Sequence, residues 1–285
     1  MAALFSSAYR WPAPAKLNLF LHVTGRRADG YHRLQTVFQF LDYGDALQFA
    51  PRGDGRIRCE GAGGAIPDDS NLAVRAARLL SDASGCGLGA DIRLIKRIPI
   101  GGGLGGGSSD AATTLVALNR LWNTGFAPDE LETLGVRLGA DVPVFLRAQA
   151  SWAEGVGERL HPVDLPEPWF LVMTPNVEVS TAAVFGDPAL RRDHEPVTEA
   201  DFRAGRCGND CEPVTRRLYP QVGEALDWLA QFGEARMSGT GASVFCAFPM
   251  ESAAHEVARH ASGRWPHFVA RGLNRSPLAD IMRGL

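Results

Sequence analysis

Hydrophobic and polar residues alternate near the start of the chain. In residues 15–23 every second side chain is apolar, and the positions between them hold Lys16, Asn18, Phe20 and His22. A period of two is typical of a β-strand that buries one face. We therefore predict a half-buried strand here, with Lys16 and Asn18 pointing the same way from its other face.

Strand patterns dominate the residues that follow. Residues 34–41 are largely apolar, and residues 53–64 hold so many glycines and charges that we expect turns and exposed hairpins there. Helical spacing begins after Asn71, where apolar side chains recur every three or four positions, and Gly85 ends it. The N-terminal stretch is thus expected to form strands, and the first helix to follow it.

The pattern changes again around a tract of glycines. Residues 90–100 alternate like a strand and lead straight into the glycines. Beyond them, apolar residues within 111–122 recur at intervals of four, three and four, the stripe of an amphipathic helix. Ser108 or Ser109 is its expected N-cap, because a hydroxyl can accept from the first free backbone N–H groups.

The remainder of the chain mixes both kinds of element. Pro128 suits the first turn of a helix that ends at Gly139, and three prolines within residues 162–168 indicate a linker between domains. Further elements are expected over residues 151–160, 170–173, 223–232, 243–248 and 253–261. Because strands and helices do not alternate regularly, we predict an α+β fold of two domains, residues 1–160 and 161–285.

Composition and charge exclude several classes of protein. Hydrophobic residues make up 45% of the 285 residues, enough for ordinary cores, which excludes a mostly disordered chain. Lys and Arg number 29 against 32 for Asp and Glu, with no basic run, so nucleic acid is not expected as a partner. The longest stretch without a charge, residues 237–250, is shorter than the ~18 residues that span a bilayer, so no membrane partner is expected either.

The five cysteines indicate a reducing compartment. They are odd in number and scattered, and the N-terminal residues lack the features of a secretory signal. Cys207 and Cys211 with His255 and His260 have too long a spacing for a zinc finger, and no metal ligands are assigned to the chain. We expect free thiols and a cytoplasmic location.

The glycine tract indicates a phosphate-binding loop. Six of the seven residues 101–107 are glycine, between a predicted strand and a predicted helix. Glycine lets a ligand approach the backbone closely, and the helix start offers free N–H groups and the positive end of the helix dipole. This combination binds phosphate, whereas a flexible surface loop, the plain alternative, seldom passes directly from an apolar strand into a capped helix.

Two known phosphate loops fit the tract less well. The Walker A loop needs Lys directly after its last glycine, and Ser108 stands there instead. The dinucleotide pattern G-x-G-x-x-G occurs at Gly101, Gly103 and Gly106, but a strand ending in an acid should follow ~20 residues on, and a second helix is expected there. A nicotinamide oxidoreductase is therefore the disfavoured alternative.

Three motifs of the chain resemble those of one enzyme superfamily. Residues 99–109, P-I-G-G-G-L-G-G-G-S-S, resemble the loop P-x-G-x-G-L-G-S/G-S-S of the GHMP kinase superfamily. P-A-K-L-N at residues 14–18 and M-S-G-T-G-A-S at residues 237–243 resemble two further motifs, in the same order. The resemblance covers nearly the whole chain and implies a two-domain GHMP kinase-like fold, with the active site in the cleft between the domains. It also implies ATP as phosphoryl donor and Mg²⁺ bound with ATP.

The resemblance assigns residues to phosphoryl transfer. Asp141 alone reads as an acid in a helix-terminal turn, but the corresponding Asp of the superfamily takes the proton of the substrate hydroxyl. Lys16, otherwise an exposed cation, would lie beside it, keep it ionised and stabilise the transition state. The loop that would hold the ATP phosphates comprises Pro99, Ile100, Gly101, Gly102, Gly103, Leu104, Gly105, Gly106, Gly107, Ser108 and Ser109.

The resemblance also assigns substrate contacts. Residues 16–32 and 139–143 are similar to superfamily members whose small-molecule substrate carries a cytidine diphosphate group. Tyr31 and His32 would then form the cytosine site, the aromatic ring by stacking and the histidine by reading a polar edge. The other expected contacts are Asn18, Thr181, Phe185, Gly239 and Thr240.

Two other functions remain open at this point. Another GHMP small-molecule kinase, of the homoserine or mevalonate type, would share the loop, and a catalytically silent nucleotide-binding protein would keep the fold. The presence of both Lys16 and Asp141 favours a working kinase. A monomer or weak homodimer is expected.

Overall fold

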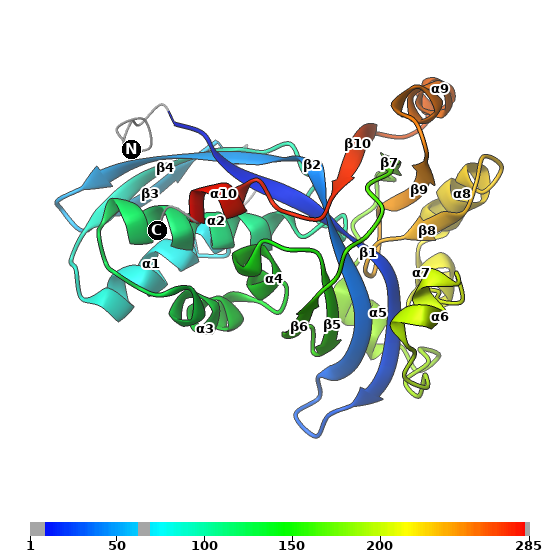
Figure 1. The fold of residues 1–285 in the computed structure, drawn as a ribbon, viewed down its shortest axis with the longest axis horizontal. Helices are drawn as coiled ribbons and strands as arrows, with labels where there is room; N and C mark the ends of the chain where they lie inside the picture. Colours follow the sequence, from blue (N-terminus) through cyan, green and yellow to red (C-terminus); the bar gives the residue numbers. More distant parts are fainter. Residues whose placement is uncertain (1–8, 62–68, 283–285) are drawn as a thin grey trace.

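Two long antiparallel strands run through both halves of the molecule. The computed structural model describes residues 9–61 and 69–282, and its first elements are β1 (Trp11–Arg26) and β2 (His32–Arg52). The two strands pair from Trp11 with Leu47 to Arg26 with His32. In Figure 1 this pair extends from the left half of the molecule down to the hairpin below the right half. Both halves are therefore built on the same two strands.

The other described strands join β1 and β2 in one sheet. They are β3 (Ile57–Glu60), β4 (Gly89–Ile95), β5 (Ser151–Gly155), β6 (Arg159–Pro162), β7 (Trp169–Met173), β8 (Ala235–Met237), β9 (Val244–Phe248) and β10 (His267–Leu273). Their order is β3-β4-β2-β10-β7-β9-β8, with β1 and β5 also on β2 and β6 on β5. The pair β3 and β4 is parallel and the other pairs are antiparallel.

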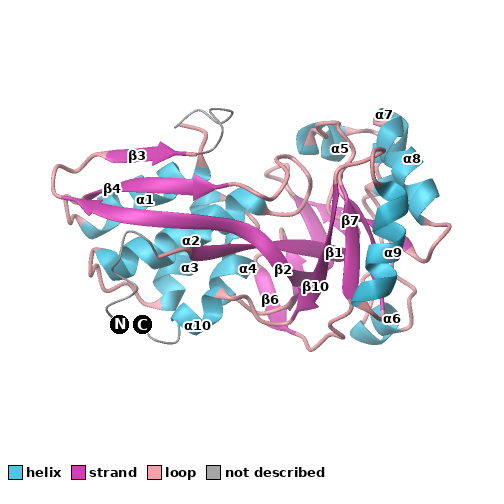
Figure 2. Ribbon diagram, turned by 90° about the horizontal axis from the view of Figure 1, so that it is seen from above, coloured by secondary structure: helices cyan, strands magenta, loops and turns pink. Residues whose placement is uncertain are grey.

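The helices fall into two groups, one for each half (Figure 2). The first group is α1 (Leu72–Ser84), α2 (Gly106–Leu121), α3 (Pro128–Leu138), α4 (Val142–Arg147) and α10 (Leu278–Met282). The second group is α5 (Thr181–Gly186), α6 (Glu199–Arg203), α7 (Glu212–Leu218), α8 (Pro220–Leu229) and α9 (Glu251–Ala261). Within the described residues, no helix combines the length and apolar character that crossing a bilayer requires.

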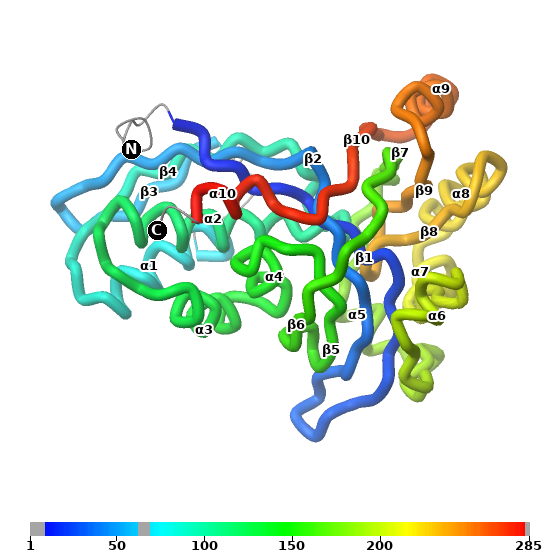
Figure 3. Tube along the Cα trace, viewed as in Figure 1, coloured from blue at the N-terminus to red at the C-terminus, as the bar shows by residue number. Residues whose placement is uncertain are grey.

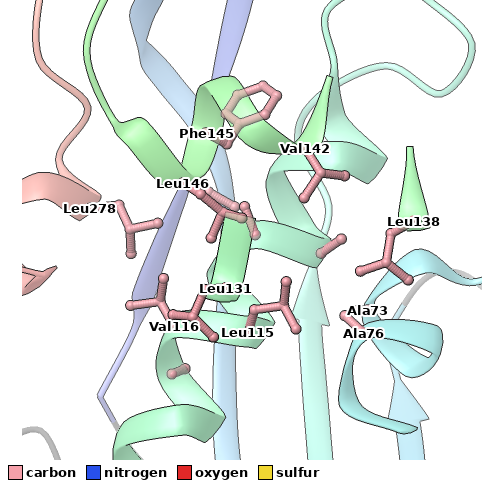
Figure 4. Close-up of a cluster of buried hydrophobic side chains, with 14 of the residues drawn as sticks. Ala73, Ala76, Leu115, Val116, Leu131, Leu138, Val142, Phe145, Leu146 and Leu278 are labelled. Atoms are coloured by element: carbon pink, nitrogen blue, oxygen red, sulfur yellow. The ribbon is translucent and has the colours of Figure 1, made fainter. Parts of the chain in front are cut away.

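Each group of helices packs against the sheet around its own core. In the first core α2 is central, and its Leu115 and Val116 lie in one cluster with Leu131, Leu146 and Leu278 (Figure 4). Truncating such a buried Leu to Ala costs about 2–5 kcal/mol. Figure 3 shows the chain returning from β10 across the molecule to α10, which brings Leu278 to this core.

The second core lies between the other helices and the C-terminal strands. It contains Leu171 from β7, Val244 from β9, and Leu226 from α8. β1 contributes to both cores, with Trp11 in the first and Leu21 in the second. The strand that carries Lys16 and Asn18 is therefore held on both sides of these residues.

Several predictions of secondary structure are confirmed. The fold is α+β, and α1 begins after Asn71, whose side chain accepts from Ala73 N, and ends at Gly85 in the left-handed conformation. Helix α3 begins at Pro128 and is capped by Gly139. The domain boundary at residues 160 and 161, with the linker over residues 162–168, stays a prediction.

The prediction of a half-buried β1 is wrong, because both of its faces are covered. Lys16, Asn18, Phe20 and His22 are all less than 5% exposed. On the face that the sequence pattern left to solvent, Lys16 meets the glycine loop and Asp141, and the rings of Phe20 and His22 meet those of Phe202 and His194. Lys16 and Asn18 are therefore buried polar groups, and each needs hydrogen-bond partners inside the protein.

Two local predictions are also wrong. Helix α2 begins one turn earlier than expected, because Gly105 is its N-cap, and Ser108 and Ser109 lie inside its first turn. Residues 53–61 do not form only turns and hairpins, since they include β3, which pairs with β4 in parallel. Residues 62–64 of that prediction lie outside the described residues. The short helix α4 has too few residues to leave a periodic pattern, and no prediction included it.

Candidate active site

A cavity of about 690 Å³ lies between the two halves, and most of the predicted site residues line it. Its walls come from β1, the turn between β1 and β2, the glycine loop, the start of α4, α5 and the turn before β9. The lining includes Lys16, Asn18, Tyr31, His32, Gly103, Gly105, Asp141, Thr181, Phe185, Gly239 and Thr240. Residues that are distant in the sequence thus meet in one place.

Lys16 is the central cation of this cavity. Its Nζ lies 3.2 Å from Asp141 Oδ2, donates to Gly103 O at 3.2 Å, and also donates to Asn18 Oδ1. The ammonium lies 5.2 Å from the centre of the Phe38 ring. The Lys16 side chain is 4% exposed, whereas that of Asp141 is 34% exposed. The carboxylate therefore faces the cavity, and the ammonium supports it from behind.

Asn18 ties this cation to the rest of the site. Its Nδ2 donates to Thr36 Oγ1 at 3.0 Å, which leaves Oδ1 as the acceptor for Lys16. The backbone N–H of Asn18 donates to Ser238 Oγ at 3.1 Å, and that hydroxyl donates to Gly103 O at 2.9 Å. Ser238 thereby connects β1 to the glycine loop; it belongs to the motif at residues 237–243 but was not among the predicted site residues.

The glycine loop depends on glycine at several of its positions. Gly101, Gly103 and Gly105 all have φ between 71° and 73°, the left-handed region that other residues adopt at a cost. A Cβ at Gly105 would lie 2.8 Å from Phe145 Cζ and 3.0 Å from Lys16 Cε. The first distance is shorter than real Cβ contacts and the second is tighter than most of them, so a glycine at this position lets the loop pass close to Lys16 and Phe145.

The glycine loop leads directly into α2, whose N-cap is Gly105. This helix has 16 residues, and no side chain caps its first turn, so its early N–H groups and positive dipole end are free for an anion. Of the predicted loop residues, Gly103 and Gly105 line the cavity. Ser109 is 1% exposed, and its hydroxyl has no partner among the described residues. Ile100 is 57% exposed and does not line the cavity.

A buried charge cluster lies beneath the loop, and sequence reasoning missed it. Lys96 Nζ donates to Asp45 Oδ2 at 2.5 Å and to Asp110 Oδ2 at 2.9 Å. Asp45 Oδ1 also accepts from the N–H groups of Arg97 and Ile98. A Cβ at Gly106 would lie 3.2 Å from Lys96 Nζ, so the ammonium sits against the first residue of α2.

The charges of this cluster are set by burial and by mutual attraction. Burial raises the pKa of Asp110, and the neighbouring Asp45 raises it further against the opposing effect of Lys96. Burial lowers the pKa of Lys96, but the two carboxylates outweigh it and the net shift is upward. One signal was available in the sequence, because the chain holds only two lysines and one of them, Lys96, lies three residues before the loop.

The predicted cytosine site consists of three aromatic rings, and two of these rings are in contact. The His32 and Phe185 rings stack with centroids 5.1 Å apart and an interplanar angle of 27°. Tyr31 lines the cavity beside them and is 63% exposed, so its face is free for a ligand. Burial, followed by the charges of Arg192 and Arg26, lowers the pKa of His32.

A second glycine turn closes the cavity on the C-terminal side. Thr240 Oγ1 lies 3.1 Å from Thr181 Oγ1, which connects the turn to α5. Thr215 Oγ1 donates to Thr240 O at 3.0 Å, and Asn209 Nδ2 donates to Gly239 O at 2.8 Å. These bonds tie the turn to the C-terminal half, and Ser243 N–H donates to Gly102 O at 3.1 Å, which connects the end of the turn to the glycine loop.

One group of described residues brings possible metal ligands together, away from the Lys16 and Asp141 pair. The ligand atoms of His22, His194 and Asp210 all lie within 4.8 Å of one another. The two imidazoles stack face to face at 3.5 Å, so their in-plane lone pairs run parallel and do not converge on one ion. His22 Nε2 also accepts from Gly208 N–H already. We interpret this group as packing that holds residues 194–210 against β1.

Comparisons with known proteins identify the family of the chain. The family model of the GHMP kinases N terminal domain matches residues 71–149, and the family model of the GHMP kinases C terminal domain matches residues 188–267. The chain belongs to the GHMP kinase family. A nicotinamide oxidoreductase is thereby excluded, and α3 follows α2 where that alternative required a strand.

The relatives of the chain narrow the comparison to one kind of kinase. The proteins named 4-diphosphocytidyl-2-C-methyl-D-erythritol kinase from Nitrosococcus oceani and Alkalilimnicola ehrlichii are 55% and 57% identical to it. The alignments cover 95% and 96% of this chain and 97% and 94% of those proteins. A crystal structure of 4-(cytidine 5'-diphospho)-2C-methyl-D-erythritol kinase matches with a TM-score of 0.81 and 35% identity, over 93% of this chain and 99% of that one.

More distant structures share only the fold. A mevalonate kinase structure matches with a TM-score of 0.67 at 15% identity, over 94% of this chain and all of that one. A homoserine kinase from Cytophaga hutchinsonii matches with a TM-score of 0.62 at 16% identity, over 93% and 94%. These matches show the fold of the chain.

Proposed function

We propose that this chain is an ATP-dependent kinase for 4-diphosphocytidyl-2-C-methyl-D-erythritol. It transfers the γ-phosphoryl group to the 2-hydroxyl and yields the 2-phosphate and ADP, a step of non-mevalonate isoprenoid precursor synthesis. The relatives of more than 50% identity carry the name of this activity. In the structure, one observation carries the proposal: Lys16 Nζ touches both the Asp141 carboxylate and the Gly103 carbonyl of the glycine loop.

Asp141 is the base in this proposal. Its carboxylate faces the cavity and can take the proton of the acceptor hydroxyl as that oxygen bonds to the γ-phosphorus. The bond between the γ-phosphorus and the β–γ bridging oxygen breaks, and ADP leaves with that oxygen. Lys16 attracts the carboxylate and neutralises negative charge that develops on the transferred group. Its burial keeps water from competing for these contacts.

The glycine loop and the start of α2 hold the ATP phosphates in this proposal. Backbone N–H groups and the helix dipole supply the attraction, while residues with φ near 70° allow the close approach. Magnesium would bind with ATP and would supply positive charge to the phosphate oxygens. The hydroxyl of Ser108, in the first turn of α2, is an oxygen donor of the type that Mg²⁺ prefers, so this residue fits the ion.

The opposite end of the cavity binds the cytidine diphosphate group. Tyr31 offers an exposed ring face for stacking, and His32 and Phe185 form a second aromatic wall. Thr181 and the turn at Gly239 and Thr240 lie between this wall and the glycine loop, where they can contact the substrate phosphates together with Asn18.

The test is an assay of ADP production. We expect turnover with the cytidine diphosphate substrate and little with the same sugar alcohol phosphate that lacks the cytidine group. Preferential turnover of mevalonate or homoserine would instead support another GHMP kinase. ATP binding without ADP production from any of them would indicate a silent nucleotide-binding protein.

The role of Asp141 as the proton acceptor is tested by Asp141→Asn, which keeps the shape of the side chain and removes its charge. We expect turnover to fall by at least ~10²- to 10³-fold, the loss that follows removal of one preorganised charge-stabilising group. Asp164→Asn, at an exposed position outside the cavity, is the matched control and should leave turnover unchanged. Near-normal turnover of Asp141→Asn would remove Asp141 as the base.

A further inference from the structure

Arg192 contacts His32 of the predicted cytosine site, and it was not among the predicted site residues. Its Nε donates to His32 Nε2 at 3.0 Å. Its remaining nitrogens donate to backbone carbonyls, Nη1 to Leu190 O at 3.0 Å and Nη2 to Phe185 O at 2.9 Å and Asp187 O at 2.7 Å. Four hydrogen bonds thus fix the guanidinium in place.

We propose that Arg192 fixes the tautomer of His32, so that His32 presents an Nδ1–H donor to the ligand and selects cytosine over uracil. This inference rests on the proposed function, in which His32 contacts the base of the substrate. It assigns Arg192 as a positioning residue that acts through His32.

The chemistry of arginine determines which nitrogen of His32 carries the proton. A guanidinium has N–H donors and no acceptor, and it does not lose its charge in proteins. The imidazole nitrogen that it faces must therefore be the acceptor, which puts the proton of the neutral ring on Nδ1. A doubly protonated ring would set one N–H against another. Burial and the charge of Arg192 lower the pKa of His32, which keeps the ring neutral.

The orientation of the His32 ring is fixed as well as its tautomer. Its face stacks on Phe185, and the backbone carbonyl of Phe185 accepts from the same guanidinium. Within residues 9–61 and 69–282, Nε2 of His32 has Arg192 as its partner and Nδ1 has none, while the residue lines the cavity. The Nδ1–H group is thus the one left for a ligand.

A fixed donor distinguishes the two pyrimidines. Both bases carry an acceptor at O2, but N3 is an acceptor in cytosine and a donor in uracil. A base that turns a donor toward His32 leaves two N–H groups without acceptors, and each unmade buried hydrogen bond lowers affinity by about 5- to 150-fold. We therefore expect kcat/KM for the cytidine substrate to exceed that for its uridine diphosphate analogue by at least tenfold.

The direct test is the tautomer of His32 in the intact, unmodified protein. Long-range ¹H–¹⁵N NMR spectra of protein labelled in histidine distinguish a protonated ring nitrogen from a bare one, and His32→Asn identifies the signal. We expect one species with the proton on Nδ1 near neutral pH. A proton on Nε2 would overturn the inference, and this result needs no arginine variant to fold.

The second test removes the positioning group. We expect Arg192→Leu to raise KM for the cytidine substrate, to change kcat less, and to lower the preference over the uridine analogue at least tenfold. Its His32 signal should also shift away from a single Nδ1–H species. Arg191→Leu is the matched control, because Arg191 is an exposed neighbour whose described ion pair is with Asp193. It should leave both measurements unchanged.

The two tests separate this inference from the proposed function. A wild-type protein that turns over neither nucleotide substrate contradicts the proposed function itself. A wild-type protein that turns over the cytidine substrate, while Arg192→Leu keeps both the preference and the Nδ1–H species, contradicts only the assignment of Arg192.

Discussion

Replacing Lys16 by Met separates the chemistry of the site from the stability of the fold. Met has a similar length and no charge, so the variant fills the slot beside Phe38 and Gly105 without the ammonium. The contacts to Asp141 Oδ2 and Gly103 O, each at 3.2 Å, are lost. Gly103 O keeps its hydrogen bond from Ser238 Oγ at 2.9 Å.

The structure predicts a small change in the free energy of unfolding and a large loss of turnover. The partner carboxylate, Asp141, is 34% exposed and can be hydrated when the ammonium is gone, so no buried charge is left unpaired. Loss of the donor to Asn18 Oδ1 costs about 1–3 kcal/mol, and this is offset because the ammonium is no longer desolvated. We expect the free energy of unfolding to stay within about 2 kcal/mol of wild type. Turnover should fall by ~10²- to 10³-fold or more, because the transferred phosphoryl group loses its charge partner.

Urea unfolding and the ADP assay measure these two effects on the same preparation. A turnover within tenfold of wild type would refute the placement of Lys16 at the reacting group. A loss of stability of several kcal/mol would refute the reasoning on hydration of Asp141, since it would show that the pair behaves as a closed buried ion pair.

Two further predictions concern the glycine loop and the residues that support it, and a third concerns the buried His22. Lys96→Met should lower the free energy of unfolding by about 3–5 kcal/mol in urea, because both of its carboxylate partners are buried, with side chains 0% and 4% exposed. Gly103→Ala should raise KM for ATP about tenfold or more, because its Cβ would overlap Ser238 O and meet a second carbonyl at 2.8 Å. Gly53→Ala, at an exposed position with open space around the new Cβ, should leave this KM unchanged, and equal values for the two variants would contradict the geometry. Burial, then the nearby histidine, lowers the pKa of His22 from its ordinary 6.5 to about 4, so the unfolded chain takes up the proton first. Urea titrations should therefore show that the wild type loses up to about 3 kcal/mol as the pH falls from 6.5 through 4, and that His22→Gln lacks this loss; parallel pH curves for the two proteins would rule out the shift.

Local features of the fold were predictable because their causes are local. Asn71 and Gly85 bound α1 as capping rules require, and Pro128 starts α3. The glycine loop between β4 and α2 was predictable for the same reason, since positive φ and close approach demand glycine in the sequence itself. The family assignment followed from motifs of this kind.

The predictions that failed depended on contacts between residues that are distant in the sequence. A period of two cannot show that a second layer will cover the polar face of β1, and so Lys16 and Asn18 were taken as exposed on one side. The N-cap of α2 moved to Gly105 because the loop packs on Phe145 and Lys16, which no capping rule includes. Arg192 reaches His32 from a segment without periodic pattern, and its contact could not be inferred from spacing.

The shared strands β1 and β2 determine how this molecule can be divided. Leu21 and Val23 of β1 belong to the C-terminal core, and Leu278 of α10 belongs to the N-terminal one. Either half, if excised and expressed by itself, would lose apolar side chains that only the other supplies. The family models mark two separate regions of sequence. In the folded chain, however, each core needs a segment from outside its own region, β1 for the C-terminal core and α10 for the N-terminal core, so neither region is a self-sufficient folding unit.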